Sequence, residues 1–110
     1  MELHQKREGD RLTLAISGKC TVEHAAALRA ALLEAVSAGP KLGLDVSGVE
    51  EADVTFLQLL LATALTMERE GASLRRSGAL CEAVRQAAHV SGFDQTPPLQ
   101  TFFADEERDG

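Results

Sequence analysis

The sequence predicts an α/β fold in which one small mixed β-sheet carries amphipathic helices mainly on one of its faces. Short segments with the alternating apolar pattern of strands are separated by longer segments with helical periodicity. A chain of 110 residues forms one compact core and is too short for two ordinary domains. With so few strands, the chain does not supply helices for both faces of a wide sheet. We therefore expect a single domain with the element order β-β-α-β-α-β-α.

Two strands are expected at the start of the chain. In residues 11–17 the large apolar side chains occupy every second position, which is typical of a half-buried strand. A first strand precedes this segment near Leu3, and the Gly9-Asp10 pair between the two is a turn signal. The two strands are therefore predicted to form an antiparallel hairpin.

The first and third helices are bounded by residues that begin and end helices. Thr21 is a candidate cap for an Ala- and Leu-rich segment up to Val36, which a Gly-Pro pair stops. Ser77 is a candidate cap for a helix at residues 79–90, and a glycine follows its last turn. The inward-facing residues of this third helix are expected to be Leu80, Val84 and Ala87.

The middle helix has the clearest periodicity, with apolar residues at positions i, i+3, i+4, i+7 and i+8. Strands are expected on both sides of it, at residues 41–46 with an exit into a loop at residues 45–48, and at residues 73–76. Residues 99–103 fit either a last strand or a short helix, and residues 104–110 are predicted to form a polar tail. The buried face of the middle helix is expected to be formed by Leu57, Leu60, Leu61, Ala64 and Leu65.

The charge of the chain argues against nucleic acid as a partner. There are 17 acidic and 11 basic residues, and the formal net charge is −6, whereas binding to a phosphate backbone depends on clustered Lys and Arg. The most apolar stretch, residues 56–67, is shorter than the roughly 20 residues of a spanning helix, so we expect no direct membrane insertion. Two cysteines without CxxC spacing and the lack of a basic, apolar leader at Met1 favour a cytoplasmic location.

No constellation for catalysis is present in the sequence. The histidines His4, His24 and His89 have no ligand-like spacing with cysteines or carboxylates, so no metal site is expected. The glycines form no phosphate-binding or dinucleotide-binding fingerprint, so no cofactor is expected. Cys20 precedes the first helix, but without a paired histidine a small buried or turn residue is the better interpretation. We expect a protein that is not an enzyme.

Two short motifs lie on either side of an acidic pair between residues 44 and 60. The segment resembles the signature of STAS domains, the family of anti-sigma-factor antagonists. In that family a strand ends in D-L-S-G-V, and D-S-S-G-L or D-S-T-G-L then opens an amphipathic helix. The resemblance covers residues 1–103 and implies a single STAS-like domain there. The matching residues are Asp45, Ser47, Gly48, Val49, Asp53, Thr55 and Leu57.

The resemblance implies that the chain is a bacterial signalling module that binds a protein partner, such as an anti-sigma-type or chemotaxis-type kinase. In such antagonists the second hydroxyl residue of the second motif is phosphorylated, and Thr55 occupies that position here. A phosphate at a helix N-terminus meets free N–H groups and the positive end of the helix dipole. The candidate partner-binding residues are Asp45, Ser47, Gly48, Asp53, Val54, Thr55 and Phe56.

The chain departs from the family pattern at two positions. Val54 replaces the first motif hydroxyl, and Phe56 replaces the glycine. An aromatic ring at this place either blocks the close approach of a partner or is itself a docking anchor. Binding of a partner is therefore a firmer expectation than phosphorylation.

Structural interpretations compete with the functional ones. Thr55 and Gln58 fit a capping box, in which the hydroxyl satisfies a free N–H, and a capping hydroxyl is compatible with phosphorylation. Asp53 is an alternative cap or helps to orient a kinase-bound metal ion, and Asp45 fits a turn residue. Glu50-Glu51 is expected to be a solvated loop where a partner docks in the family.

A second function is compatible with the same resemblance. STAS-like proteins also serve as small components of ABC systems for lipid transport, where the domain binds an ATPase subunit permanently. Phosphorylation would then be irrelevant to the activity.

Overall fold

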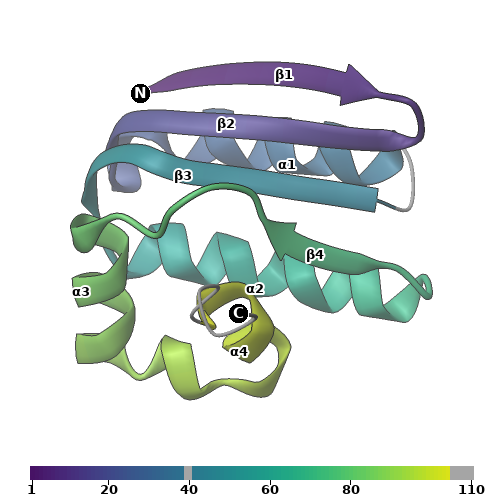
Figure 1. Ribbon diagram of the computed structural model, residues 1–110. Helices are drawn as coiled ribbons and strands as arrows, with labels where there is room; N and C mark the ends of the chain where they lie inside the picture. The colour runs from purple at the N-terminus through teal and green to yellow at the C-terminus, as the bar shows by residue number, and fades with distance from the viewer. Residues whose placement is uncertain (39–40, 105–110) are drawn as a thin grey trace.

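The computed structural model describes residues 1–38 and 41–104 (Figure 1). The Gly39-Pro40 pair expected to stop the first helix, and residues 105–110 of the expected tail, lie outside the described residues. The elements are β1 (Glu2–Glu8), β2 (Arg11–Cys20), α1 (Ala25–Ser37), β3 (Lys41–Ala52), α2 (Val54–Arg69), β4 (Ser73–Arg76), α3 (Glu82–Ser91) and α4 (Pro97–Phe103), with short 3-10 turns at Val22–His24 and Phe93–Gln95.

The strands form one mixed sheet in the order β1-β2-β3-β4. Strands β1 and β2 pair antiparallel, and β2 pairs with β3, and β3 with β4, in parallel. The hairpin between β1 and β2 turns at Gly9, whose φ of 63° lies in the left-handed region that glycine adopts at no steric cost. The predicted hairpin, the mixed sheet and the order of the first seven elements are confirmed.

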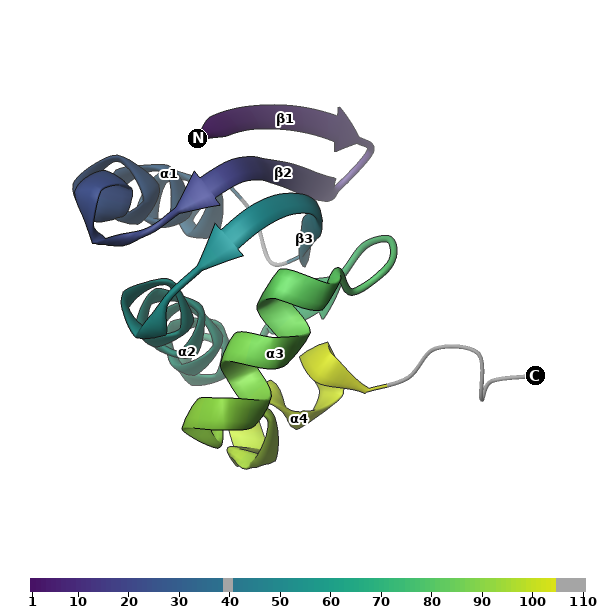
Figure 2. The ribbon, with the colours of Figure 1, turned by 90° about the vertical axis from the view of Figure 1, so that its left-hand side faces the viewer.

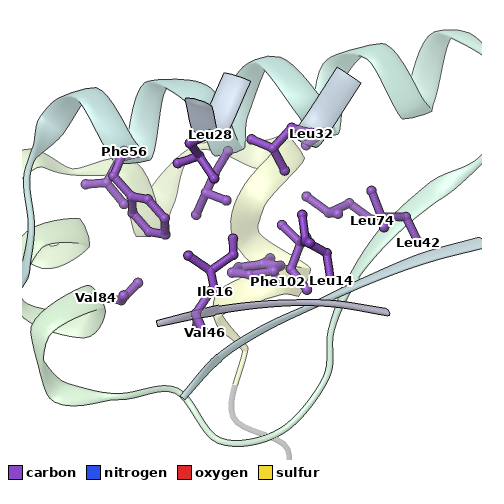
Figure 3. Packing of buried hydrophobic residues seen from close by; sticks show 14 of the residues in the cluster. Leu14, Ile16, Leu28, Leu32, Leu42, Val46, Phe56, Leu74, Val84 and Phe102 are labelled. Carbon is purple, nitrogen blue, oxygen red and sulfur yellow. The ribbon is translucent and has the colours of Figure 1, made fainter. Parts of the chain in front are cut away.

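The helices pack on one side of the sheet and enclose the core. Helices α1 and α2 lie behind the sheet in Figure 1, and α3 and α4 close the core beside α2 and β4. Leu12, Leu14 and Ile16 alternate along β2 and are buried, as the two-residue period predicts. Figure 3 shows Leu14 and Ile16 packed with Leu28 of α1 and Phe102 of α4. The predicted α/β fold class is confirmed.

The buried face of α2 differs from the predicted one. Leu57, Leu60 and Ala64 are buried as expected, but Leu61 is only half-buried and Leu65 is 42% exposed. The face toward the sheet is rotated because apolar residues occur on several sides of this helix, so the apolar pattern alone does not fix its rotation. The remaining buried residues of α2 are Phe56, Thr63 and Met67.

The ends of two other elements also differ from expectation. Helix α1 begins only after a 3-10 turn, and Thr21 makes no side-chain cap hydrogen bond. Helix α3 begins at Glu82, because the Ser77 amide still donates to the Leu44 carbonyl (2.8 Å) and so continues the pairing of β4 with β3. In α3 the buried residues are Val84 and Ala88, while Leu80 and Ala87 are half-buried. The segment 99–103 is part of the short helix α4, which is one of the two alternatives expected for it.

Candidate functional site

The candidate site lies where β3 ends and α2 begins. Strand β3 runs on to Ala52, so the loop expected at residues 45–48 is wrong. Ala15 pairs with Asp45 but Ser17 pairs with Gly48, which places one extra residue in β3. The Ser-Gly pair therefore forms a β-bulge inside a strand, which uses the same polar and small residues as a loop.

The side chain of Asp45 holds this bulge in shape. Its Oδ1 atom accepts hydrogen bonds from the Ser47 amide (3.0 Å) and the Ser47 hydroxyl (2.7 Å). A Cβ atom at Gly48 would lie 2.9 Å from the Ser17 Cβ atom, closer than real side chains approach each other. Asp45 and Gly48 thus have clear structural roles here, in agreement with the expected turn role of Asp45.

Asp53 is the cap of α2 and also ties this helix to the preceding one. Its Oδ1 atom accepts from the Phe56 amide (3.2 Å), and its Oδ2 atom accepts from the Val22 amide at the start of the first helical segment (3.0 Å). The alternative in which Asp53 is the cap is confirmed. The bond to Val22 was missed by sequence reasoning, because no local pattern links residues this far apart in the chain.

Thr55 is the second residue of α2 and does not act as its cap, so the capping-box interpretation with Gln58 is wrong. The Thr55 hydroxyl has no hydrogen-bond partner among the described residues. In the same residues, every side-chain nitrogen or oxygen atom that is fully buried has a hydrogen-bond partner. The hydroxyl oxygen of the half-buried Thr55 is therefore reached by solvent. This hydroxyl is therefore not enclosed in the core and makes no contact that holds the described fold.

The two residues beside Thr55 point in different directions. Val54 is 48% exposed, whereas Phe56 is 1% exposed and its ring points into the core (Figure 3). The interpretation of Phe56 as a docking anchor is therefore wrong, since its ring contributes no surface. The same burial shows that the ring does not obstruct the approach to Thr55.

A groove runs beside the start of α2. Figure 2, which views this end of the molecule, shows α3 beside α2 and the end of β3. The groove has a volume of about 470 Å³, its floor is mainly apolar, and Val54 and Val90 at its edges are 48% and 75% exposed. Its lining residues, called the docking groove below, are Glu50, Glu51, Ala52, Asp53, Val54, Ala83, Gln86, Ala87, Val90 and Ser91.

Carboxylates give one wall of the docking groove a negative character. Glu50 and Glu51 are both exposed and line the groove beside Asp53. They belong to β3, so the expected loop at this pair is wrong, although its exposure is as expected. An apolar floor with an acidic wall is a surface that suits a protein segment carrying apolar and basic side chains.

The cysteines near the groove are not arranged for nucleophilic chemistry. Cys20 is 1% exposed, and burial raises the pKa of its thiol from 9.0 to about 11, with smaller raising effects from Cys81 and Asp53 and a lowering effect from the N-terminal amino group. The Cys81 thiol donates to the Val49 carbonyl (3.3 Å). Cys20 is thus a buried core residue, as the sequence indicated.

The described part of the chain offers neither a metal-binding cluster nor a membrane-spanning helix. Within residues 1–38 and 41–104, no group of three or more His, Cys, Asp or Glu side chains is placed to hold a metal ion. The same residues include no helix with the length and apolar character needed to cross a bilayer.

Comparisons with solved structures identify the fold. An anti-sigma factor antagonist from Mycobacterium paratuberculosis is 23% identical and superposes with a TM-score of 0.72 over 94% of each chain. A proposed anti-sigma factor antagonist from Thermotoga maritima is 19% identical, with a TM-score of 0.72 over 86% of this chain and 81% of that one. The anti-sigma factor antagonist SpoIIAA in its unphosphorylated form is 11% identical, with a TM-score of 0.63 over 87% of this chain and 98% of that one.

Identities this low show a shared fold and nothing finer. No protein with a curated description matches the sequence. A family model described as Mlab, STAS domain, matches residues 3–101, which is nearly the whole chain. The bulge motif, the cap of α2 and the accessible threonine all lie inside that match, and the chain belongs to the STAS domain family.

Proposed function

We propose that this chain is a regulatory protein-interaction module that binds a partner kinase or regulator at the start of α2, without catalysis of its own. The observation that carries the proposal is the hydroxyl of Thr55, which is accessible, has no partner among the described residues and lies one residue from the docking groove. Thr55 is the proposed phosphorylation site. A partner of this kind acts in the cytoplasm, where we place the chain.

The contacts divide the proposed binding residues into two groups. Val54 and Thr55 present side-chain surface to a partner, and the exposed Ser47 lies on the neighbouring bulge. Asp45, Gly48 and Asp53 shape that surface. The Asp45 carboxylate and the small size of Gly48 fix the bulge, and the Asp53 carboxylate caps α2. Phe56 supports the surface from within the core.

Phosphorylation would change the charge of this surface without removing a contact that holds the fold. A phosphate adds about −1.5 to −2 charge at pH 7. At Thr55 that charge would stand next to the Asp53 carboxylate and the acidic wall of the docking groove. A partner that buries this surface would have to desolvate the added charge, which costs binding free energy, whereas the positive end of the α2 dipole would accommodate the phosphate in the free chain.

The comparisons support this proposal at the level of the family. SpoIIAA, which shares the fold, is an anti-sigma factor antagonist whose solved form is distinguished as unphosphorylated. The departure at Val54 removes one hydroxyl of the family motif and leaves Thr55 as the hydroxyl residue of the second motif. We therefore expect a single phosphate per chain.

The proposal is tested with a kinase encoded beside the gene for this chain. Incubation with that kinase and ATP should add the mass of one phosphate to the intact protein, located at Thr55 by peptide mapping, and none to Thr55→Ala. Thr55→Glu should raise the Kd for the kinase by about tenfold, because the added carboxylate must lose its hydration in the complex, whereas Thr55→Ala should change it by about twofold or less.

Ala62→Glu is the matched control. Ala62 is exposed on the same helix about two turns further along and outside the docking groove, so the same added charge there should leave the Kd nearly unchanged. A complex that forms equally well with Thr55→Glu and Thr55→Ala would reject the phosphorylation switch and leave the binding role intact. Failure of Val54→Asp to weaken the complex would reject the docking groove itself.

A second candidate function is a permanent subunit of an ABC system for lipid transport, bound to its ATPase. The apolar surface at Val54 and Val90 favours it, because permanent interfaces are more hydrophobic than transient ones. Co-purification with an ATPase encoded beside this gene, in a complex that survives Thr55→Glu, would select this function. A complex dispersed by Thr55→Glu would exclude it.

A further inference from the structure

Three basic side chains gather on the face of the sheet that lies opposite the core. Arg11 of β2, Lys41 of β3 and Arg75 of β4 line a hollow with a volume of about 190 Å³, together with Leu42. Arg11 pairs with Lys41 across β2 and β3, and Arg75 pairs with Gly43 across β3 and β4. Three neighbouring parallel strands thus each contribute one cation.

The alternation of the strands places all three cations on this face. Each is next in sequence to a leucine whose side chain is buried in the core, namely Leu12, Leu42 or Leu74. Because successive side chains of a strand point to opposite faces, Arg11, Lys41 and Arg75 point away from the core. Arg76 shows the contrast, since it points to the helix side and donates to the Phe102 carbonyl (2.7 Å) and the Ala104 carbonyl (3.0 Å).

The positive charge of this hollow is only partly neutralised. Lys41 forms an exposed ion pair with Asp10, with 3.4 Å between Nζ and Oδ2. In residues 1–38 and 41–104, neither Arg11 nor Arg75 takes part in an ion pair or a side-chain hydrogen bond. Two unpaired guanidinium groups thus face one hollow. The electrostatic potential there is expected to be positive, although the net charge of the chain is −6.

We propose that this hollow is a binding site for the phosphate group of a small molecule. Guanidinium groups match phosphate oxygens with paired hydrogen bonds, and two of them with one ammonium are a common way to hold such a group. Lys41 and Arg75 lie on the neighbouring strands β3 and β4, where Arg75 pairs with Gly43, two residues after Lys41. That volume admits a phosphate with a small substituent.

The site is separate from the proposed docking groove. Lys41 is the first residue of β3 and Ala52 is the last, so the two sites lie at opposite ends of this strand. The inference therefore stands or falls independently of the proposed function.

The test is a titration of the full, isotope-labelled chain with inorganic phosphate, and separately with pyrophosphate, at constant ionic strength. Saturable amide shifts are expected at Arg11, Gly43 and Arg75. Arg11→Gln and Arg75→Gln should each raise the Kd about tenfold, since each removes a charge-assisted contact. Arg85→Gln, an exposed arginine on α3, is the matched control and should leave the Kd unchanged.

Two outcomes would overturn the inference. Shifts that stay linear with anion concentration would show that no site saturates, and an equal loss of binding in Arg85→Gln would show a general effect of charge. Both arginines of the hollow are exposed, so thermal midpoints of the variants should match that of the unmodified chain and exclude unfolding as the cause. Tighter binding of pyrophosphate would assign the site to phosphate esters or diphosphates, and equal binding would assign it to free phosphate.

Discussion

Replacement of Asp53 by alanine should destabilise the domain by about 2 kcal/mol. The change removes the acceptor of the Phe56 amide, a cap contribution of about 1 kcal/mol, and the acceptor of the Val22 amide, a hydrogen bond of about 1 kcal/mol. The unfolding equilibrium constant should rise about thirtyfold. Asp53→Asn keeps one oxygen and replaces the other by a donor, so it retains one of the two bonds and should cost about half as much.

The chain has no Trp or Tyr, so urea unfolding is best followed by far-UV circular dichroism. Glu51→Ala, in the same segment and exposed, is the control and should change the free energy of unfolding by about 0.5 kcal/mol or less. A loss below about 0.5 kcal/mol for Asp53→Ala would refute the double role of this side chain. An Asp53→Asn variant as unstable as Asp53→Ala would refute the assignment of one bond to each oxygen.

Two further predictions concern the bulge and the buried thiol. Gly48→Ala should lower the free energy of unfolding in urea by about 1–3 kcal/mol, because its Cβ atom would lie 2.9 Å from the Ser17 Cβ atom. Adding Ser17→Gly should restore part of this loss. Gly43→Ala is the control, since its nearest contact is 3.6 Å, and an equal cost there would contradict the steric explanation. Burial raises the pKa of the Cys20 thiol from 9.0 to about 11, so above pH 9 the unfolded chain loses a proton that the folded chain keeps, and the free energy of unfolding should fall toward pH 11. Cys20→Ala should show a smaller fall over the same pH range, and identical slopes would refute the linkage.

The element order could be predicted because strand and helix periodicities differ clearly in this sequence, but the bulge of β3 could not. Asp45, Ser47 and Gly48 are residue types that favour turns, and a loop and a β-bulge both use them. What distinguishes the two is the pairing of β3 with Ser17 on β2 beyond the bulge, which is a long-range contact. Local composition carries no information on that pairing.

The motif positions near α2 could be located from the sequence, whereas their roles depended on tertiary structure. Thr55 and Asp53 were both candidate caps, and only the helix start at Val54 decides between them. The apolar run of α2 left its rotation open, so the burial of Phe56 could not be deduced. The docking groove also needs α3, which the chain brings beside α2 only after β4.

The first turn of α2 separates the contacts that hold the fold from the atoms available to a partner. The Asp53 carboxylate holds the helix start by accepting hydrogen bonds from two backbone amides, and the Phe56 ring holds it by packing in the core. Val54 and the Thr55 hydroxyl make no such contact in the described chain and face the surface. A charge placed on Thr55 therefore alters the surface at one end of the docking groove while the cap and the core stay in place, which is the physical condition that a reversible switch requires.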